Sequence, residues 1–317
     1  MREIMHTDLT YLDCSSIMVS MKKLSAADRV RVISALVEGC SIRSTVRMTG
    51  VAKNTVVKLL ADIGGACMAY HDKHVRNIKS RRIQADEIWC FVGMKQKNVP
   101  AERKDEFGVG DVWTWVAMDA DSKLCVSYML GLRDGGYATE FMRDVADRLA
   151  NRVQLTTDGH KAYLEAVEDT FVGEIDYAQL IKIYGPTTAG AGRYSPPACI
   201  GCETHTIAGE PEWKHVSTSY VERQNLTVRM GMRRFTRLTN AFSKKAENLA
   251  YNLALHYMHY NFCRIHQTLR VTPAMEAGIA DHVWEIEELV ALLEAEELKQ
   301  IELGAMKRGK YKPKMLE

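Results

Sequence analysis

The feature that most constrains the fold is the change of hydrophobic pattern that begins at Ile83. Three strands in hairpin-like succession are predicted first, over residues 83–92, 112–118 and 124–130. Helices and strands then alternate, at residues 137–150, 153–157, near 162–167 and near 174–177. Hairpin-like strands followed by alternating helices and strands predict an α/β fold, a mixed sheet covered by helices.

This order of elements is ribonuclease-H-like, and in that topology the first strand and the end of the fourth are neighbours. Asp86 lies in the first strand, Asp158 ends the fourth, and Glu222 lies in a predicted helix further along the chain. Three converging carboxylates suit hard cations such as Mg²⁺, which prefer oxygen ligands. Two such ions, about 4 Å apart, activate an attacking hydroxyl and stabilise a leaving oxygen. Asp86, Asp158 and Glu222 are therefore predicted to be catalytic metal ligands for phosphodiester chemistry.

Taken singly, each acid also has a structural explanation. Asp86 can cap a turn or pair with the Arg81–Arg82 segment, Asp158 can form a turn with Gly159, and Glu222 can pair with Arg223. Their order along the chain favours the joint catalytic interpretation over three separate structural ones.

Strand and helix geometry predicts where two neighbours of these acids point. Glu87 follows Asp86 in a strand, where successive side chains point to opposite faces, so it is left out of the metal ligands. Arg229 lies seven positions after Glu222, nearly two helical turns, so it is predicted on the same helix face. There it is expected to grip a phosphate beside the metals.

The net charge of +2 conceals two opposed blocks. Between residues 214 and 245 the only acid is Glu222, among Lys214, Arg223, Arg229, Arg233, Arg234, Arg237, Lys244 and Lys245. Residues 285–302 are instead rich in glutamate. A basic block beside a metal-binding carboxylate suits a polyanion such as DNA, so Arg229, Arg233 and Arg234 are predicted DNA contacts. The alternative is a solvated basic face.

Residues 24–63 carry a helical pattern in three parts. Gly39 breaks the first helix, a short second helix follows, and Gly50 supplies the turn before the third. This predicts a helix-turn-helix whose last helix presents DNA-contacting residues, namely Lys53, Asn54, Thr55 and Lys58. The alternative is a small bundle that only packs or dimerises, and Ala52 is a poor helix cap.

The length of 317 residues and the 46% hydrophobic content predict a globular protein of about two domains. No apolar run is long enough for a membrane span or a signal core, so a cytoplasmic protein without a membrane partner is expected. Most of the eight cysteines stand alone, which predicts reduced thiols. Cys199 and Cys202 form one CxxC, followed by His205; without a second pair, a loop with two thiols is favoured over a zinc site.

The expected organisation has five parts. They are an N-terminal extension (1–20), a helix-turn-helix domain (21–65), a basic linker (66–82), a catalytic domain (83–262) with an insertion at 178–216, and a C-terminal helical tail (263–317).

Several motifs together resemble the DDE transposases of the insertion-sequence-one family. They are Gln84-Ala85-Asp86-Glu87-Ile88-Trp89, Thr157-Asp158-Gly159, Val221-Glu222-Arg223-Gln224-Asn225, the segment 237–245 and the segment 260–273. The resemblance covers about residues 84–280. It implies a ribonuclease-H-like core, dependence on Mg²⁺ or Mn²⁺, recognition of terminal inverted repeats and a multimer assembled on DNA. A cysteine-rich zinc finger typical of that family is missing here, so end recognition is expected from the helices alone.

The sequence thus predicts a transposase that cleaves DNA at the ends of an insertion sequence and joins the freed 3′-hydroxyl to target DNA. The alternatives are a DNA-binding regulator with a degenerate core, or a nuclease that hydrolyses without joining.

Overall fold

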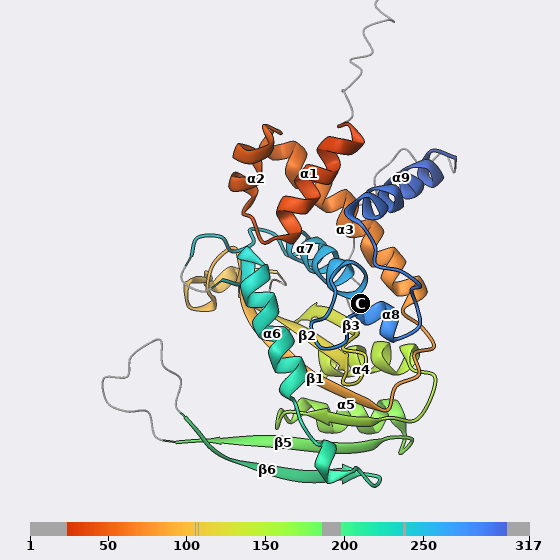
Figure 1. Ribbon diagram of the computed structural model, residues 1–317. Helices are drawn as coiled ribbons and strands as arrows, with labels where there is room; N and C mark the ends of the chain where they lie inside the picture. Colours follow the sequence, from red (N-terminus) through yellow and green to blue (C-terminus); the bar gives the residue numbers. More distant parts are fainter. Residues whose placement is uncertain (1–23, 105, 107, 186–197, 237–238, 303–317) are drawn as a thin grey trace, which may run out of the picture.

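The computed structural model describes residues 24–302 except 105, 107, 186–197 and 237–238 (Figure 1). Its centre is a six-stranded mixed sheet of order β3-β2-β1-β4-β5-β6. The strands are β1 (Arg82–Val92), β2 (Gly110–Asp119), β3 (Cys125–Gly131), β4 (Gln154–Thr157), β5 (Asp176–Tyr184) and β6 (Cys199–Ala208). β1, β2 and β3 are antiparallel neighbours, β4 and β5 run parallel to β1, and β6 is antiparallel to β5. The predicted mixed sheet is confirmed, and so is the prediction that the first and fourth strands lie side by side.

Helices cover both faces of this sheet. The helices are α1 (Ala26–Val37), α2 (Ile42–Thr49), α3 (Lys53–His74), α4 (Gly135–Arg148), α5 (Ala162–Phe171), α6 (Ser219–Gly231), α7 (Ala246–Met258), α8 (Pro273–Glu276) and α9 (Ile286–Glu302). Because side chains alternate along β1, Ile83 and Ala85 are buried in the cluster that contains α4 and α5. Ile88 and Cys90 are buried in a second cluster with residues of α6 and α7.

The three N-terminal helices share the main hydrophobic core with the sheet. Val32 and Ile33 of α1 and Leu60 of α3 are buried in the same cluster as Ile83 of β1. α3 packs along α7 and α9. The segment 66–82 was expected to be a basic linker. Most of it is instead helical or extended, because α3 continues to His74 and β1 begins at Arg82.

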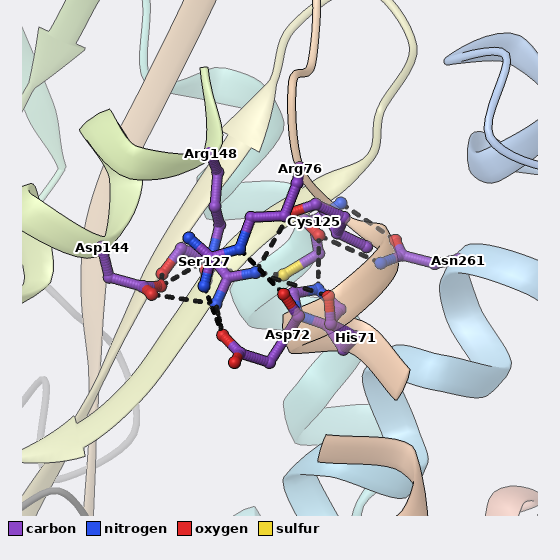
Figure 2. A network of polar contacts seen from close by, with 9 residues as sticks. His71, Asp72, Arg76, Cys125, Ser127, Asp144, Arg148 and Asn261 are labelled. Atoms are coloured by element: carbon purple, nitrogen blue, oxygen red, sulfur yellow. Dashed lines mark hydrogen bonds and ion pairs between the residues drawn. The ribbon is translucent and has the colours of Figure 1, made fainter. Parts of the chain in front are cut away.

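A buried polar network fixes the end of α3 to the sheet (Figure 2). Arg148 of α4 donates hydrogen bonds to two backbone oxygens at the C-terminal end of α3, those of His71 and Val75, at 3.4 and 3.1 Å. The His71 oxygen also accepts the backbone N–H of Val75, at 2.9 Å. The guanidinium of Arg148 also binds both carboxylate oxygens of Asp144, at 2.8 and 2.9 Å. Burial, together with Arg148, lowers the pKa of His71 to about 3, so this imidazole is neutral.

The segment predicted as an insertion, 178–216, carries part of the sheet itself. β5 continues to Tyr184 and β6 pairs with it along its length, so the sheet has one strand more than the pattern predicted. The error arose because β6 is an exposed edge strand of polar residues and cysteines, whose pattern shows no apolar alternation.

The remaining expectations concern the chain ends and membranes. The predicted extension (1–20) and residues 303–317 of the predicted tail lie outside the described residues. Within the tail, α8 and α9 are helical, as expected. None of the helices described is both long and apolar enough to span a bilayer.

Candidate active site

The register of β1 against β4 brings the first two predicted acids together. The last paired residues are Ala85 and Thr157, so Asp86 and Asp158 each follow the final position of the pairing. Asp86, Glu87 and Asp158 each offer a carboxylate oxygen, and these atoms lie within 4.8 Å of one another. The predicted convergence of the two aspartates across the sheet is therefore present in the structure.

Asp86 is the most perturbed member of this acid cluster. Its Oδ1 accepts a hydrogen bond from the backbone N–H of Glu87, and its Oδ2 accepts one from Nδ2 of Asn225, both at 2.8 Å. Burial and the charges of Glu87 and Asp158 raise its pKa to about 7, and Glu222 contributes in the same direction. A divalent cation beside Asp86 would offset the neighbouring negative charges and so stabilise the ionised form of this carboxyl group.

Glu222 reaches the same cavity from α6. This open cavity of about 750 Å³ is lined by Asp86, Arg133, Asp158, Gly159, His160, Lys161, Leu180, Ile181, Lys182, Tyr184, Thr218 and Glu222. The carboxylate of Glu222 accepts a hydrogen bond from Thr218 and forms an ion pair with Lys182 of β5. All three predicted acids thus face one space, although Glu222 is not in the tight group of carboxylates.

Two contacts with β1 hold α6 in place. Oε1 of Gln84 accepts hydrogen bonds from the backbone N–H groups of Tyr220 and Val221, at 2.9 and 3.2 Å. These groups are among the first N–H donors of the helix, which have no partner inside it. One turn later, Asn225 binds Asp86. Gln84 and Asp86 lie on the same face of β1, so the strand positions both its own acid and the helix that carries Glu222.

Glu87, which the sequence analysis leaves out of the metal ligands, lies within the acid cluster. Its side chain does turn to the other face of β1, because its Oε2 accepts a hydrogen bond at 3.0 Å from the hydroxyl of Tyr163 on α5. Its carboxylate nevertheless stays near Asp86 and Asp158, because β4 ends at this level and leaves the space open. Burial and Asp158 raise its pKa, and Arg133 opposes that rise.

Arg133 is a site residue that sequence reasoning missed. It lies between β3 and α4, where its Nε donates to Oε1 of Glu87 at 2.5 Å and its Nη2 lies 3.7 Å from Oδ2 of Asp158. The guanidinium is 4.8 Å from the centre of the Trp113 ring. No pattern in the sequence singles it out, since only the fold brings the β3–α4 connection beside β1.

The three predicted DNA contacts that follow Glu222 in the chain differ in burial and in their partners. Arg229 lies along β1, with Nη2 3.5 Å from the backbone oxygen of Trp89, and it does not line the cavity. Arg233 is exposed. Arg234 turns inward and donates to Asn252 and Ser243, and burial lowers its pKa to about 10.

The predicted contacts of the N-terminal helices lie at the start of α3. Lys53 and Asn54 are exposed, whereas Thr55 is half-buried. Lys58 forms an ion pair with Asp62 one turn later, at 3.2 Å. The three helices are present, and their reading of DNA stays a prediction.

Cys199 and Cys202 both lie on β6 and are exposed. Among the residues that the structure describes, the acid cluster is the one group of three or more histidine, cysteine or acidic side chains near enough to share a metal ion. The two thiols were expected in a loop, and the structure places them on a strand instead.

The donor set of the acid cluster fits a hard divalent cation. It consists of carboxylate oxygens alone, with no sulfur or imidazole ligand, which is the preference of Mg²⁺ and Mn²⁺ rather than of zinc. The raised pKa of Asp86 gives a second reason, because a divalent charge relieves the repulsion that causes the rise.

No protein-family model and no curated protein sequence matches the chain. Among solved structures, a piggyBac transposase synaptic complex with hairpin DNA is similar at 11% identity and a TM-score of 0.41, over 89% of this chain and 73% of that one. The Mos1 strand transfer complex is similar at 16% identity and a TM-score of 0.22, over 49% of this chain and 58% of that one. No match supports the insertion-sequence-one family in particular, and likeness at these scores leaves the function to be argued from the chain's own residues.

Proposed function

We propose that this protein is a metal-dependent transposase that cleaves DNA strands at the ends of an insertion sequence and joins them to target DNA. The observation that carries the proposal is the single cavity onto which Asp86, Asp158 and Glu222 converge from β1, the end of β4 and α6. These are the three acids that the DDE motifs of the sequence single out. Their convergence is what the chemistry requires of residues that lie so far apart in the chain.

The three acids and Glu87 have separate roles in this proposal. Asp86 and Asp158 are the residues that would hold Mg²⁺ or Mn²⁺, and Glu222, which lines the same cavity, would complete the ligand set. Glu87 is buried and bonded to Tyr163 and Arg133, so it supports the cluster electrostatically. When bound, the metal supplies Lewis-acid activation of a hydroxyl and charge stabilisation of the leaving oxygen.

The chain's own residues then account for the remaining requirements. Asn225 fixes the carboxylate plane of Asp86 through its hydrogen bond at 2.8 Å, and Gln84 fixes the first turn of α6. Positioning of this kind accounts for much of phosphoryl-transfer catalysis. No covalent protein nucleophile is needed, because water attacks in cleavage and the freed 3′-hydroxyl attacks in joining.

Recognition of the DNA ends is assigned to the N-terminal helices, with Lys53 and Asn54 as the most accessible of the predicted contacts. Arg233 is the most accessible contact of the basic block. Assembly as a homo-oligomer on DNA, and residence in the bacterial cytoplasm at the nucleoid, belong to the same proposal.

The test is a cleavage and joining assay with a DNA fragment that carries the ends of the chain's own element, in Mg²⁺, Mn²⁺ or EDTA. Asp86→Asn, Asp158→Asn and Glu222→Gln should each reduce both steps by at least about 100-fold, because each removes a charged metal ligand. The matched control is Asp169→Asn, an exposed acid of α5 outside the cavity, which should keep full activity.

DNA binding by the same variants, measured in EDTA, separates catalysis from recognition. End binding should change less than about twofold, since the acids do not contact DNA without metal. Specific binding without metal-dependent cutting in the wild-type chain would indicate the regulator instead. Cutting without joining would indicate the nuclease.

A further inference from the structure

Two cationic side chains, Arg133 and Lys182, line the acid-lined cavity, and each is paired with carboxylates of the site. Arg133 contacts Glu87 and Asp158. Lys182 of β5 contacts Glu222.

We propose that Arg133 and Lys182 form a phosphodiester-binding site, in which Arg133 stays on Glu87 but releases Asp158, Lys182 releases Glu222, and each side chain binds a phosphate oxygen when a divalent cation occupies the acids. The inference rests on the proposed function for its substrate class, DNA. It adds two residues that the sequence motifs do not contain.

Exposure distinguishes these pairs from the buried ion pairs of the same chain. The side chain of Arg148, which contacts the end of α3, is 6% exposed, and that of Arg29 is 5% exposed. Those of Arg133 and Lys182 are 39% and 28% exposed, and both line the open cavity. Their charged groups therefore reach a ligand in the cavity without unfolding of the surrounding structure.

The chemistry of the two groups suits an exchange of partners. A carboxylate that binds a divalent cation has less charge to offer a side-chain cation, so metal binding and these ion pairs compete. The planar guanidinium of Arg133 matches two phosphate oxygens at once, and its stacking on Trp113 limits the orientations that it adopts. Lys182 contributes a point charge from a flexible stem.

The ion pairs also explain why the acids remain close together before any metal is present. Without counter-charges, the carboxylates of Glu87 and Asp158 would repel each other, and Arg133 contacts both. The two cations thus act in turn on the acids and on the substrate, and neither role requires a large movement of the backbone.

The experiment compares Arg133→Gln and Lys182→Gln with Arg152→Gln in the full chain. Arg152 is a matched control, because its side chain is 41% exposed and also bridges two carboxylates, Asp176 at 2.8 Å and Glu174 at 3.5 Å, away from the acid-lined cavity. Mn²⁺ affinity is measured by electron paramagnetic resonance without DNA. Affinity for a fluorescent DNA duplex is measured by anisotropy at several salt concentrations, in EDTA and in Ca²⁺.

Both cavity variants should bind Mn²⁺ roughly three- to tenfold more tightly than the wild type, because a competing cation is gone. In Ca²⁺ they should bind DNA roughly tenfold more weakly, with a salt slope smaller by about one phosphate contact. In EDTA their DNA affinity should change less than about twofold. Arg152→Gln should match the wild type throughout.

Arg133→Lys, which keeps the charge, should restore the wild-type Mn²⁺ affinity and only part of the DNA affinity. If Arg133→Gln does not fold, as judged by thermal unfolding, Lys182→Gln tests the site alone. Weaker Mn²⁺ binding by the variants, or an unchanged DNA affinity in Ca²⁺, would show that the pairs are purely structural and overturn the inference. A wild-type chain that binds no Mn²⁺ would overturn the proposed function as well.

Discussion

Asn225 of α6 donates a hydrogen bond of 2.8 Å to Oδ2 of Asp86 on β1, and so joins the helix that carries Glu222 to the strand that carries the first acid. Asn225 is buried and lies three positions after Glu222, on a neighbouring part of the same helix face. One side chain therefore couples two walls of the cavity that are far apart in the sequence.

Replacement of this amide should affect the site more than the fold. For Asn225→Ala, we expect strand cleavage to fall roughly tenfold and Mn²⁺ affinity to fall with it, because the orientation of Asp86 is lost. The free energy of unfolding, from urea titration, should fall by about 1–2 kcal/mol for a hydrogen bond to a charged group. Leu226→Ala, at an exposed position of the same helix, should change neither quantity appreciably. An unaltered Mn²⁺ affinity in Asn225→Ala would show that the contact serves the fold alone.

The pKa of Asp86 predicts an unusual dependence of stability on pH. In the folded, metal-free protein this pKa is about 7, above the ordinary value of 3.8, so folding takes up a proton between these values. The contribution of Asp86 to stability is therefore greatest at low pH and is lost as pH rises from about 4 to about 7. Asp86→Asn should be more stable than the wild type at pH 8, on the order of 2 kcal/mol, and should lack this part of the slope.

Thermal unfolding from pH 5 to pH 8, with and without Mg²⁺, measures this effect. Mg²⁺ should stabilise the wild type at pH 8 and leave Asp86→Asn nearly unchanged. Asp169→Asn serves as the control for removal of a carboxylate. Loss of stability at pH 8 on replacement of Asp86 would mean that its charge is compensated within the folded protein, and would contradict the assignment.

The sequence predicted those strands whose own residues carry the pattern of burial, and missed a strand whose residues do not. The strands around Ile83, Val116 and Val126 were predicted because a buried strand shows its own apolar residues, and the proximity of Asp86 and Asp158 followed from the order of elements. β6 was missed because an exposed edge strand needs no apolar alternation.

The residues that complete the site were missed for a different reason. Arg133, Lys182 and Gln84 act through contacts between elements that only the tertiary fold brings together. Glu87 was excluded by the correct rule that strand side chains alternate, yet its carboxylate is close to Asp86 because β4 ends beside it. Alternation gives the direction of a side chain, whereas the distance between its end and a neighbour depends on the surrounding elements.

Glu87 should prove to be a supporting residue with a large structural effect. Its side chain is fully shielded from solvent and accepts hydrogen bonds from Arg133 and Tyr163. Glu87→Ala leaves the buried hydroxyl of Tyr163 without its acceptor, so we expect stability to fall by about 1–3 kcal/mol while Mn²⁺ affinity falls less than in Asp86→Asn. Urea unfolding and Mn²⁺ titration measure both effects. A loss of Mn²⁺ affinity equal to that of Asp86→Asn would make Glu87 a direct ligand.

Adjacent glycines of α3 test whether the N-terminal helices are truly part of the core. A Cβ atom on Gly64 would lie 2.5 Å from Cβ of Tyr251 on α7 and 2.6 Å from its backbone oxygen, whereas one on Gly65 would meet its nearest atom, Cε1 of the same ring, only at 4.0 Å. Alanine is the better helix former by about 0.5–1 kcal/mol, so Gly65→Ala should be neutral or stabilising.

Gly64→Ala should instead force α3 away from α7 and lower the free energy of unfolding by on the order of 2–3 kcal/mol. Because α3 and the sheet share one hydrophobic cluster, this loss should appear in a single unfolding transition rather than in a separate early one. Urea unfolding followed by circular dichroism and by tryptophan fluorescence decides the point. Two separate transitions would mean that the helices fold as an independent domain, in which case the close approach of Gly64 to Tyr251 contributes little to the stability of the sheet and the helices that cover it.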